Sequence, residues 1–498
     1  MSESKSMLPE RIRKQLLTIT LIGGAVRLLL LLLPKSFLVT YRLPDDAMYY
    51  FTIARNLVSD SGISFDGVEP TNGFHPLWLF VITPIYWITG GEWDSVYVIL
   101  ALQSLLDTAL IFACGYAAYK ALDLHEQERH YAAIAAALMY AFNPISVIRG
   151  INGLETTVAA LLLIVWLIKY IEHRRSGAGS YYALASLSAL VFLSRTDLVF
   201  LLVPALIVLV IHDAKRGFRT SKLLLPALAG LAIVAPWLLW SYVTFGSIVQ
   251  TSGEAVAIFA KAKYDIIFAA GGYASYIISE TLRTWIKPFI YSSFGVGAIA
   301  IFLIARRRTD RKHLALFASL LLGTLALFTY HILSRGFIRD WYVIQLVPLF
   351  IVVTSVAFAH FAGSRRLFLW LTLSLFFCGW IWEFTHPRLE SQQVFLGQRS
   401  TADAVVGGFN SGYLGYLAEG PVINLDGVVN NDILHYLRTK DVRRYIDSVG
   451  ITEIRDFRGT LGGYRNLFAP ELTQGFQLVD SVDAGHGEIL ETWRRMPR

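Results

Sequence analysis

The stretch LLLPALAGLAIVAPWLLWSYVTF, residues 223–245, is one of a series of apolar runs that decide the fold of this chain. A helix of about 20 apolar residues crosses the hydrocarbon core of a bilayer. Of the 498 residues, 55% are hydrophobic and 16% are charged, and the mean hydropathy is +0.50. An ordinary soluble domain carries roughly 25% charged residues. This composition predicts an integral membrane protein and excludes a soluble enzyme, a disordered chain and a disulfide scaffold.

The other apolar segments and the basic clusters between them predict the topology. Since the basic clusters fall at every second connection, all of them can be cytoplasmic together. The N-terminus and the basic loop near residues 120–129 can share that side only if one of the first three segments does not cross. Residues 77–89 are short and contain Pro84, which favours a re-entrant or interfacial helix. We therefore expect about eleven spans with the N-terminus inside, among the segments 16–33, 77–89, 96–120, 131–148, 155–171, 180–193, 198–212, 223–245, 286–305, 314–334, 342–362 and 367–384.

The chain after about residue 385 is polar and rich in glycine. Short apolar runs at 405–409, 422–425, 476–482 and 489–493 predict strands, and residues 432–438 and 440–449 predict helices. We expect a mainly α, polytopic membrane domain at residues 1–384 and a small extracytoplasmic α/β domain at 385–498. Asp426, in the sequence Asn-Leu-Asp-Gly, is a candidate functional residue there, although an Asp before Gly is more often a turn residue.

The first outer loop, within about residues 34–95, holds the most informative polar stretch, YRLPDDAMYYFTIARNLVSDSGISFDGVEPTNGFHPLW at 41–78. Its residues 46–58 have an apolar rhythm that predicts an amphipathic helix on the membrane surface. Asp45 and Asp46 stand at the start of that helix, beside Tyr49 and Tyr50. A carboxylate there could cap the helix, or it could hold an acceptor and take its proton as a general base.

This arrangement resembles the GT-C integral-membrane glycosyltransferases, in particular their bacterial branch. That superfamily includes protein O-mannosyltransferases, the aminoarabinose transferase that acts on lipid A, and mycobacterial arabinofuranosyltransferases. The resemblance covers most of the chain in layout. It is carried at residue level by the acidic pair Asp45 and Asp46, by NGFHPLW at 72–78, by NGLET at 152–156, by SRTD at 194–197 and by NLDG at 424–427.

The resemblance implies inverting transfer of a sugar from a polyprenyl-phosphate carrier to a protein, lipid or glycan acceptor. The reaction would occur at the outer face of the plasma (inner) membrane. Carried onto this sequence, Asp45 is the general base and Asp46 is its partner or substitute. The O-mannosyltransferases have an Asp-Glu pair where this chain has Asp45-Asp46, so the choice between the two carboxylates stays open. Some GT-C enzymes use a divalent cation and others do not, so the metal dependence stays open, although this sequence requires no metal and marks no metal ligands.

A phosphate leaving group needs cationic stabilisation. The outer-face candidates are Lys261, Arg283, Arg335 and Arg339, and the last two stand out because basic residues are disfavoured on that face. The alternative role of these cations is to anchor the chain at lipid headgroups. The further candidates for substrate binding, whose alternative roles are structural, are Tyr49, Tyr50, Asn72, His75, Glu155 and Asp197.

Two other functions are consistent with a polytopic chain of this kind. A transporter or flippase of lipid-linked sugars should carry ionisable residues near the middle of the membrane, whereas the acids here concentrate in outer loops and at span ends. A ligase-like enzyme of the O-antigen type would depend on an outer histidine or arginine and not on the acidic pair. The sequence has no Walker or Rossmann glycine loop, which disfavours a nucleotide-sugar donor, and no basic stripe for nucleic acid.

Overall fold

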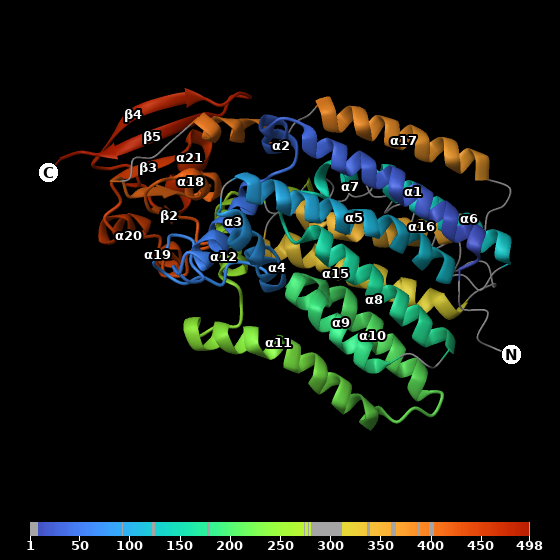
Figure 1. Ribbon diagram of the computed structural model, residues 1–498. Coiled ribbons are helices and arrows are strands. Elements are labelled where there is room, and N and C mark those ends of the chain that lie inside the picture. The colour runs from blue at the N-terminus through green and yellow to red at the C-terminus, as the bar shows by residue number, and fades with distance from the viewer. Residues whose placement is uncertain are drawn as a thin grey trace.

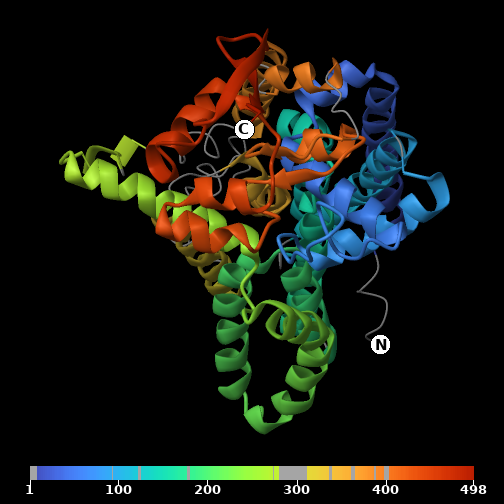
Figure 2. The same cartoon turned by 90° about the vertical axis from the view of Figure 1, so that its left-hand side faces the viewer.

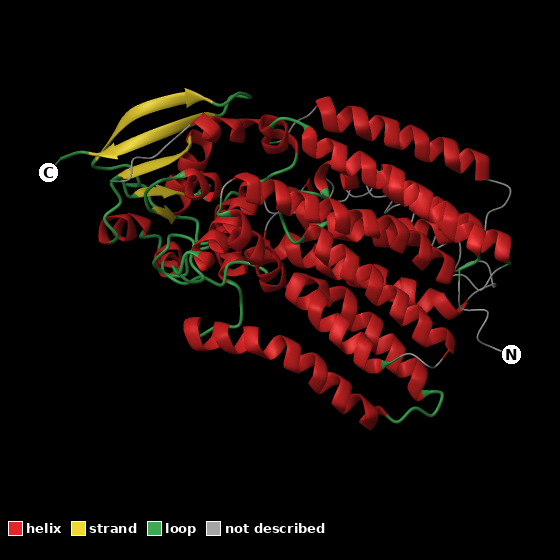
Figure 3. Cartoon of the chain, in the orientation of Figure 1, coloured by secondary structure: helices red, strands yellow, loops and turns green. Residues whose placement is uncertain are grey.

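The computed structural model describes residues 8–91, 93–121, 125–176, 180–272, 274–276, 278–279, 311–335, 339–359, 365–385, 389–397 and 403–497. Long helices form a bundle, and a small sheet with its own helices stands at one end of it (Figures 1 and 3). The fold is therefore mainly α with a small α/β region at the C-terminus, as the sequence predicts. Its bundle helices are α1 (Glu10–Leu29), α5 (Trp93–Lys120), α6 (Glu126–Phe142), α8 (Thr156–Ser176), α9 (Tyr181–Ser194), α10 (Val199–Ala214), α11 (Leu224–Phe245), α15 (Arg311–Arg335), α16 (Val347–Ala359) and α17 (Arg365–Thr385).

Within the described residues, six helical segments are long and apolar enough to cross a membrane. Three shorter apolar helices accompany them, and one is Pro76–Thr89, the segment predicted not to cross. The predicted segment 286–305 lies outside the described residues, and the count of eleven spans stays a prediction. The six long segments are Glu10–Leu32, Trp93–Lys120, Thr156–Arg175, Thr196–Ala214, Thr220–Phe245 and Ala315–Ser334.

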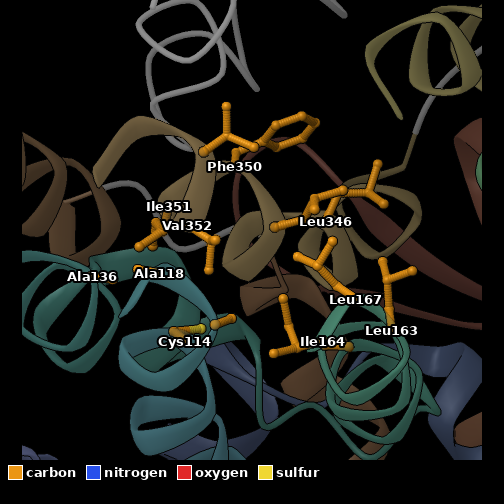
Figure 4. Packing of buried hydrophobic residues seen from close by; sticks show 14 of the residues in the cluster. Cys114, Ala118, Ala136, Leu163, Ile164, Leu167, Leu346, Phe350, Ile351 and Val352 are labelled. Carbon is orange, nitrogen blue, oxygen red and sulfur yellow. The ribbon is translucent and has the colours of Figure 1, made fainter. Parts of the chain in front are cut away.

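The bundle core combines close apolar packing with a buried ion pair between α1 and α5. Cys114 packs there among aliphatic side chains (Figure 4), as expected of a small apolar residue. Nearby, the guanidinium of Arg27 in α1 pairs with the carboxylate of Asp107 in α5, and the hydroxyl of Tyr140 in α6 donates to the same carboxylate. Arg27 also donates to the carbonyl oxygens of Tyr140 and Ala141 at 3.2 and 2.9 Å. These contacts link three helices through groups that would be costly to bury singly.

The first loop folds into three helices, α2 (Lys35–Tyr41), α3 (Asp45–Val58) and α4 (Pro76–Thr89). The predicted helix is present and begins at Asp45, directly after Pro44. It is not confined to a surface, however, because most of its first ten residues are buried. The C-terminal helix α18 (Gly412–Leu417) packs on one side of α3, and α4 packs on another. In Figure 2 the C-terminal residues, orange to red, lie beside the blue helices of this loop.

The C-terminal region is a five-stranded sheet of order β2-β1-β3-β5-β4. Strands β1 (Val406–Gly408), β2 (Val422–Asn424) and β3 (Glu453–Phe457) are mutually parallel, with β1 in the middle. Strand β5 (Ile489–Arg495) is antiparallel to β3 and to β4 (Phe476–Asp483). The accompanying helices are α18, α19 (Ile433–Thr439), α20 (Val442–Ser448) and α21 (Arg458–Phe468).

The sequence pattern predicts four of these strands but not β3. Strand β3 has charged residues at three of its five positions, and all five are buried. These charged residues have buried partners: Glu453 pairs with Arg455, and the Asp456 carboxylate accepts from the backbone amides of Phe409 and Asn410 at 2.7 and 2.8 Å. Hydropathy alone cannot identify such a strand, because its burial depends on partners from β1 and the loop that follows it.

Candidate active site

A cavity of about 390 Å³ lies between the end of the bundle and the C-terminal sheet. Its volume is within the roughly 300–1,000 Å³ typical of small-molecule sites. The bundle side contributes α3, α12 (Thr251–Ala269) and the segment 339–342. The C-terminal side contributes the loops after β1 and β2, the helix α21 that follows β3, and the turn between β4 and β5. The lining residues are Asp46, Tyr49, Ala255, Val256, Phe259, Arg339, Tyr342, Asn410, Asp426, Val428, Gly459, Thr460, Gly463, Tyr464 and Glu488.

Asp46 and Arg339, two of the predicted site residues, both line this cavity. Burial raises the pKa of Asp46 to about 6, against the opposing effect of the Arg339 charge. The guanidinium carbon of Arg339 also lies 5.5 Å from the ring centre of Trp341. The site thus combines the carboxylate of Asp46, which can accept a proton near neutral pH, with the guanidinium of Arg339, which can bind an anionic group.

Asp45, the neighbouring acid, points elsewhere. Its two carboxylate oxygens accept hydrogen bonds from the backbone amides of Gly412 and Tyr413, at 3.0 and 2.9 Å. Asp45 thereby caps the start of α18, a helix more than 360 residues further along the chain. Burial raises the pKa of Asp45 to about 6, and these two backbone hydrogen bonds oppose the shift. Asp45 is not among the described residues that line the cavity.

Tyr49 and Tyr50 also separate on α3. Tyr49 lines the cavity, and its hydroxyl accepts from the Ser411 amide at 3.2 Å and donates to the Phe409 carbonyl at 3.4 Å. The Tyr50 hydroxyl donates to Glu155 Oε2 at 2.9 Å and accepts from the His75 amide at 3.0 Å. Of the pair, Tyr49 is therefore placed to contact a bound molecule and Tyr50 to connect the first loop with the bundle.

Glu155 and Asp197 meet in a buried network centred on Arg195. Arg195 donates to Glu155 Oε1 at 2.7 Å and to both oxygens of Asp197 at 3.0 and 2.8 Å. It also donates to the Trp341 carbonyl at 3.0 Å, and Asp197 contacts the ring of His331 at 3.1 Å. That ring stacks on Tyr342, a lining residue, at 4.7 Å. The network therefore contacts Trp341 and Tyr342, which follow Arg339 in the chain, and its two acids are already paired with Arg195.

Asn72 and His75 have structural contacts as well. Asn72 Oδ1 accepts from the Thr251 amide at 3.1 Å, at the start of α12, and from Asn431 Nδ2 at 3.2 Å. Thr251 Oγ1 in turn donates to the Gly427 carbonyl at 3.3 Å. His75 Nδ1 lies 3.3 Å from Gln250 Nε2, the residue before Thr251. Asn72 thus connects the motif at 72–78 with the start of α12, and Thr251 continues this connection to the motif at 424–427.

The remaining predicted cations have different outcomes. Lys261 is exposed on α12 and is not among the described lining residues. Arg335 is the last residue of α15, and Arg283 lies outside the described residues. Among the residues that the structure describes, no group of three or more His, Cys, Asp or Glu side chains is arranged to hold a metal ion.

Most of the other lining residues follow a C-terminal strand, and among these only Asp426 is a candidate from the sequence. Asn410 comes after β1, Asp426 after β2, and Thr460 and Tyr464 after β3. Burial, together with the nearby charges of Asp46 and Asp45, raises the pKa of Asp426 to about 8, although hydrogen bonds from Val428 and Asn424 oppose the shift. The Asn-Leu-Asp-Gly motif marks Asp426, but no motif marks Asn410, Thr460 and Tyr464, and the charged residues of β3 do not predict the strand that precedes the last two.

Comparison with known proteins agrees with this architecture. Residues 70–240 match the family of dolichyl-phosphate-mannose-protein mannosyltransferases. The oligosaccharyltransferase of Archaeoglobus fulgidus superposes with a TM-score of 0.53 at 12% identity, covering 93% of this chain and 72% of that one. ArnT from Cupriavidus metallidurans, in a structure bound to undecaprenyl phosphate, superposes with a TM-score of 0.52 at 14% identity, covering 96% and 97%. No curated protein matches the chain significantly by sequence.

These similarities, together with the apolar helices, identify the chain as an integral membrane protein with the GT-C glycosyltransferase fold. The resemblance that the sequence motifs indicated is confirmed at that level. The fold and the family match together indicate a glycosyltransferase.

Proposed function

We propose that this protein transfers a sugar from a polyprenyl-phosphate carrier to an acceptor, with inversion at the anomeric carbon. The observation that carries this proposal is that Asp46 and Arg339 line one cavity. The family match to mannosyltransferases named for a dolichyl-phosphate donor supports the donor class, as does the shared fold with an ArnT that holds undecaprenyl phosphate. The acceptor is a protein, a lipid or a glycan.

In this mechanism Asp46 is the general base, in place of the sequence-based first choice, Asp45. An acceptor hydroxyl or amine attacks the anomeric carbon from the side opposite the phosphate, and its proton passes to the Asp46 carboxylate. The bond between the anomeric carbon and the phosphate oxygen breaks, and the carrier phosphate leaves as an anion that Arg339 stabilises. A base with a pKa of about 6 is mostly ionised at neutral pH and is still basic enough to accept a proton.

The other predicted residues have supporting roles in the proposal. Tyr49 contacts the bound substrates from the cavity wall, while Tyr50, Asn72, His75, Glu155 and Asp197 hold the surrounding segments in place. Residues 1–384 form the membrane domain and residues 385–498 a domain that covers the site. We place the protein in the plasma (inner) membrane, with the N-terminus cytoplasmic and the C-terminal domain outside.

The test is sugar transfer in proteoliposomes that are offered a panel of labelled polyprenyl-phosphate sugars and a mixture of acceptors. Asp46→Asn should lower turnover by about 10²–10⁴-fold, the usual contribution of a general base. Asp265→Asn, which changes an exposed acid on α12, is the matched control and should leave turnover unchanged. Sugar that crosses the bilayer without being transferred, or full transfer by Asp46→Asn, would contradict the proposal.

A further inference from the structure

The C-terminal sheet contributes a distinct wall to the cavity. Strands β1, β2 and β3 are parallel, so their carboxyl ends lie at one edge of the sheet. The segments that leave this edge, two loops and the start of α21, carry Asn410, Asp426 and Thr460, and all three line the cavity. The chain leaves β1 toward β2 on one side and leaves β3 toward β5 and β4 on the other. In open α/β sheets, the crevice at such a change of direction is where ligands bind.

The polar groups of this wall are held firmly. The Asn410 side-chain amide donates to Thr460 Oγ1 at 2.9 Å and to Asp456 Oδ1 at 3.1 Å, which connects the loop after β1 with β3 and with the start of α21. Asp426 Oδ1 accepts from the Val428 amide at 2.8 Å, within a turn that Asn424 also stabilises through the Gly427 amide at 2.9 Å. The orientation of these side chains is therefore fixed before any ligand arrives, as specific recognition requires.

Aromatic rings complete the wall. Tyr464 of α21 stacks on Phe409 with ring centres 3.8 Å apart, and Phe259 of α12 lies 5.5 Å from Tyr464. Tyr464 and Phe259 both line the cavity. A pocket with apolar aromatic faces and a few fixed polar groups is suited to a ring that has both C–H faces and hydroxyl edges. Among the described lining residues, carboxyl groups outnumber the one arginine, Arg339, which disfavours an acidic ligand on this wall.

We propose that the carboxyl edge of the C-terminal sheet binds the transferred sugar and selects it. The ring lies against Tyr464, and the hydroxyls of an uncharged sugar bond to the side chains of Asp426 and Thr460. This inference rests on the proposed function, because the sugar must lie between the phosphate at Arg339 and the acceptor at Asp46. The edge residues then decide which lipid-linked sugar is used, while Asp46 and Arg339 carry out the transfer.

The experiment measures kcat/KM in proteoliposomes for the preferred lipid-linked sugar, for its single-deoxy analogues and for its uronic acid form. The wild-type enzyme should reject at least one deoxy donor and the uronate by about 10²-fold or more, because the loss of a hydroxyl leaves fixed polar groups unpaired. Asp426→Asn and Thr460→Val should each reduce the ratio of kcat/KM between the preferred donor and one of its deoxy analogues by at least about tenfold. Asp426→Asn keeps the oxygen that the Val428 amide needs, so the turn should survive.

Tyr464→Leu should raise KM for the donor, whereas Tyr464→Phe should retain the wild-type KM because it keeps the ring. Asp480→Asn, at an exposed position on β4, is the matched control for Asp426→Asn. Thermal unfolding of each variant separates a folding defect from a binding defect.

The outcomes distinguish the two proposals. If the wild-type protein transfers no sugar, or Asp46→Asn transfers it normally, the proposed function is wrong. If transfer depends on Asp46 while the edge variants keep wild-type donor selectivity, or change the choice of acceptor instead, only the inference about the sheet edge is overturned. Efficient transfer of the uronate would also overturn it.

Discussion

The backbone amide of Tyr413 donates a hydrogen bond of 2.9 Å to the carboxylate of Asp45, and the Gly412 amide donates a second. A carboxylate in this position holds the C-terminal region onto α3. In Asp45→Asn the side chain keeps one oxygen but turns an amide group toward a second N–H donor. We expect a loss of about 1–2 kcal/mol in the free energy of unfolding, as for a lost helix cap.

Thermal unfolding and limited proteolysis of the C-terminal region measure this effect. At low temperature, where Asp45→Asn stays folded, its turnover should be at least about tenfold higher than that of Asp46→Asn. The reason is that only Asp46→Asn removes the general base. An intact, stable Asp45→Asn protein with no activity would instead make Asp45 the base.

The pH dependence of transfer should report the ionisation of Asp46. Its pKa of about 6 predicts that kcat/KM rises with pH through about 6 and then levels. Arg339 lowers this pKa, so Arg339→Gln should move the rise toward higher pH as well as reduce the rate. A pH–rate profile of each enzyme is the measurement. An unshifted profile in Arg339→Gln would show that the two side chains are not coupled.

Stability should change with pH in the opposite sense to activity. Burial raises the pKa of Asp45, Asp46 and Asp456 to about 6 and that of Asp426 to about 8. The folded protein therefore binds more protons than the unfolded chain between about pH 4 and 8, and these groups make it less stable as pH rises through that window. The midpoint of thermal unfolding in detergent should fall from pH 5 to pH 8. In Asp426→Asn the unfolding midpoint should fall less at the high-pH end of this range, because that variant lacks the group with the pKa of about 8.

Arg339→Gln should also lower turnover by about 10²–10³-fold, as expected when a preorganised group that stabilises the leaving charge is lost. Arg339→Lys keeps the charge but loses the planar guanidinium, so it should recover part of the rate. Lys261→Gln is the matched control, because Lys261 is exposed on α12. Single-turnover transfer measures the effect. If Arg339→Gln and Lys261→Gln lose the same share of turnover, the positive charge of Arg339 acts only through the overall charge of the protein and not at the leaving group.

Gly73 should not tolerate a side chain, because a Cβ atom there would lie 1.9 Å from the Val428 carbonyl oxygen. Gly73→Ala must push the loop that carries Asp426 away, at about 1–3 kcal/mol for overpacking. Gly462→Ala is the matched control, since a Cβ there meets nothing within 4 Å. Gly73→Ala should change both the midpoint of thermal unfolding and the donor selectivity, whereas Gly462→Ala should change neither. If Gly73→Ala is destabilised but keeps the wild-type donor selectivity, the position of this loop does not determine which sugar is used.

The ion pair in the bundle core should show strong coupling. Arg27→Met or Asp107→Leu alone leaves one buried charge without its partner and should cost about 3–5 kcal/mol. The double variant should recover most of this loss, because neither charge remains. Thermal unfolding of the two single variants and the double variant forms the double-mutant cycle. Additive losses would mean that the contacts of Arg27 to backbone carbonyls matter more than the pair itself.

The sequence by itself determined the membrane-protein class, the bundle helices of the described residues and the first-loop helix that begins at Asp45. These features depend on apolar runs and local periodicity, which act within a short segment. It also marked the motifs at 72–78 and 424–427, and Gly73 of the first permits close approach to Val428, directly after the second.

Only the tertiary structure decided how the two adjacent acids differ. Consecutive residues on a helix point about 100° apart, so Asp45 reaches the amides of α18 while Asp46 faces the cavity. The pairing of Glu155 with Arg195 and the site residues after β3 likewise depend on contacts between segments far apart in the chain. Such contacts have no local signature, because burial and partner choice arise only when the bundle and the C-terminal sheet pack together.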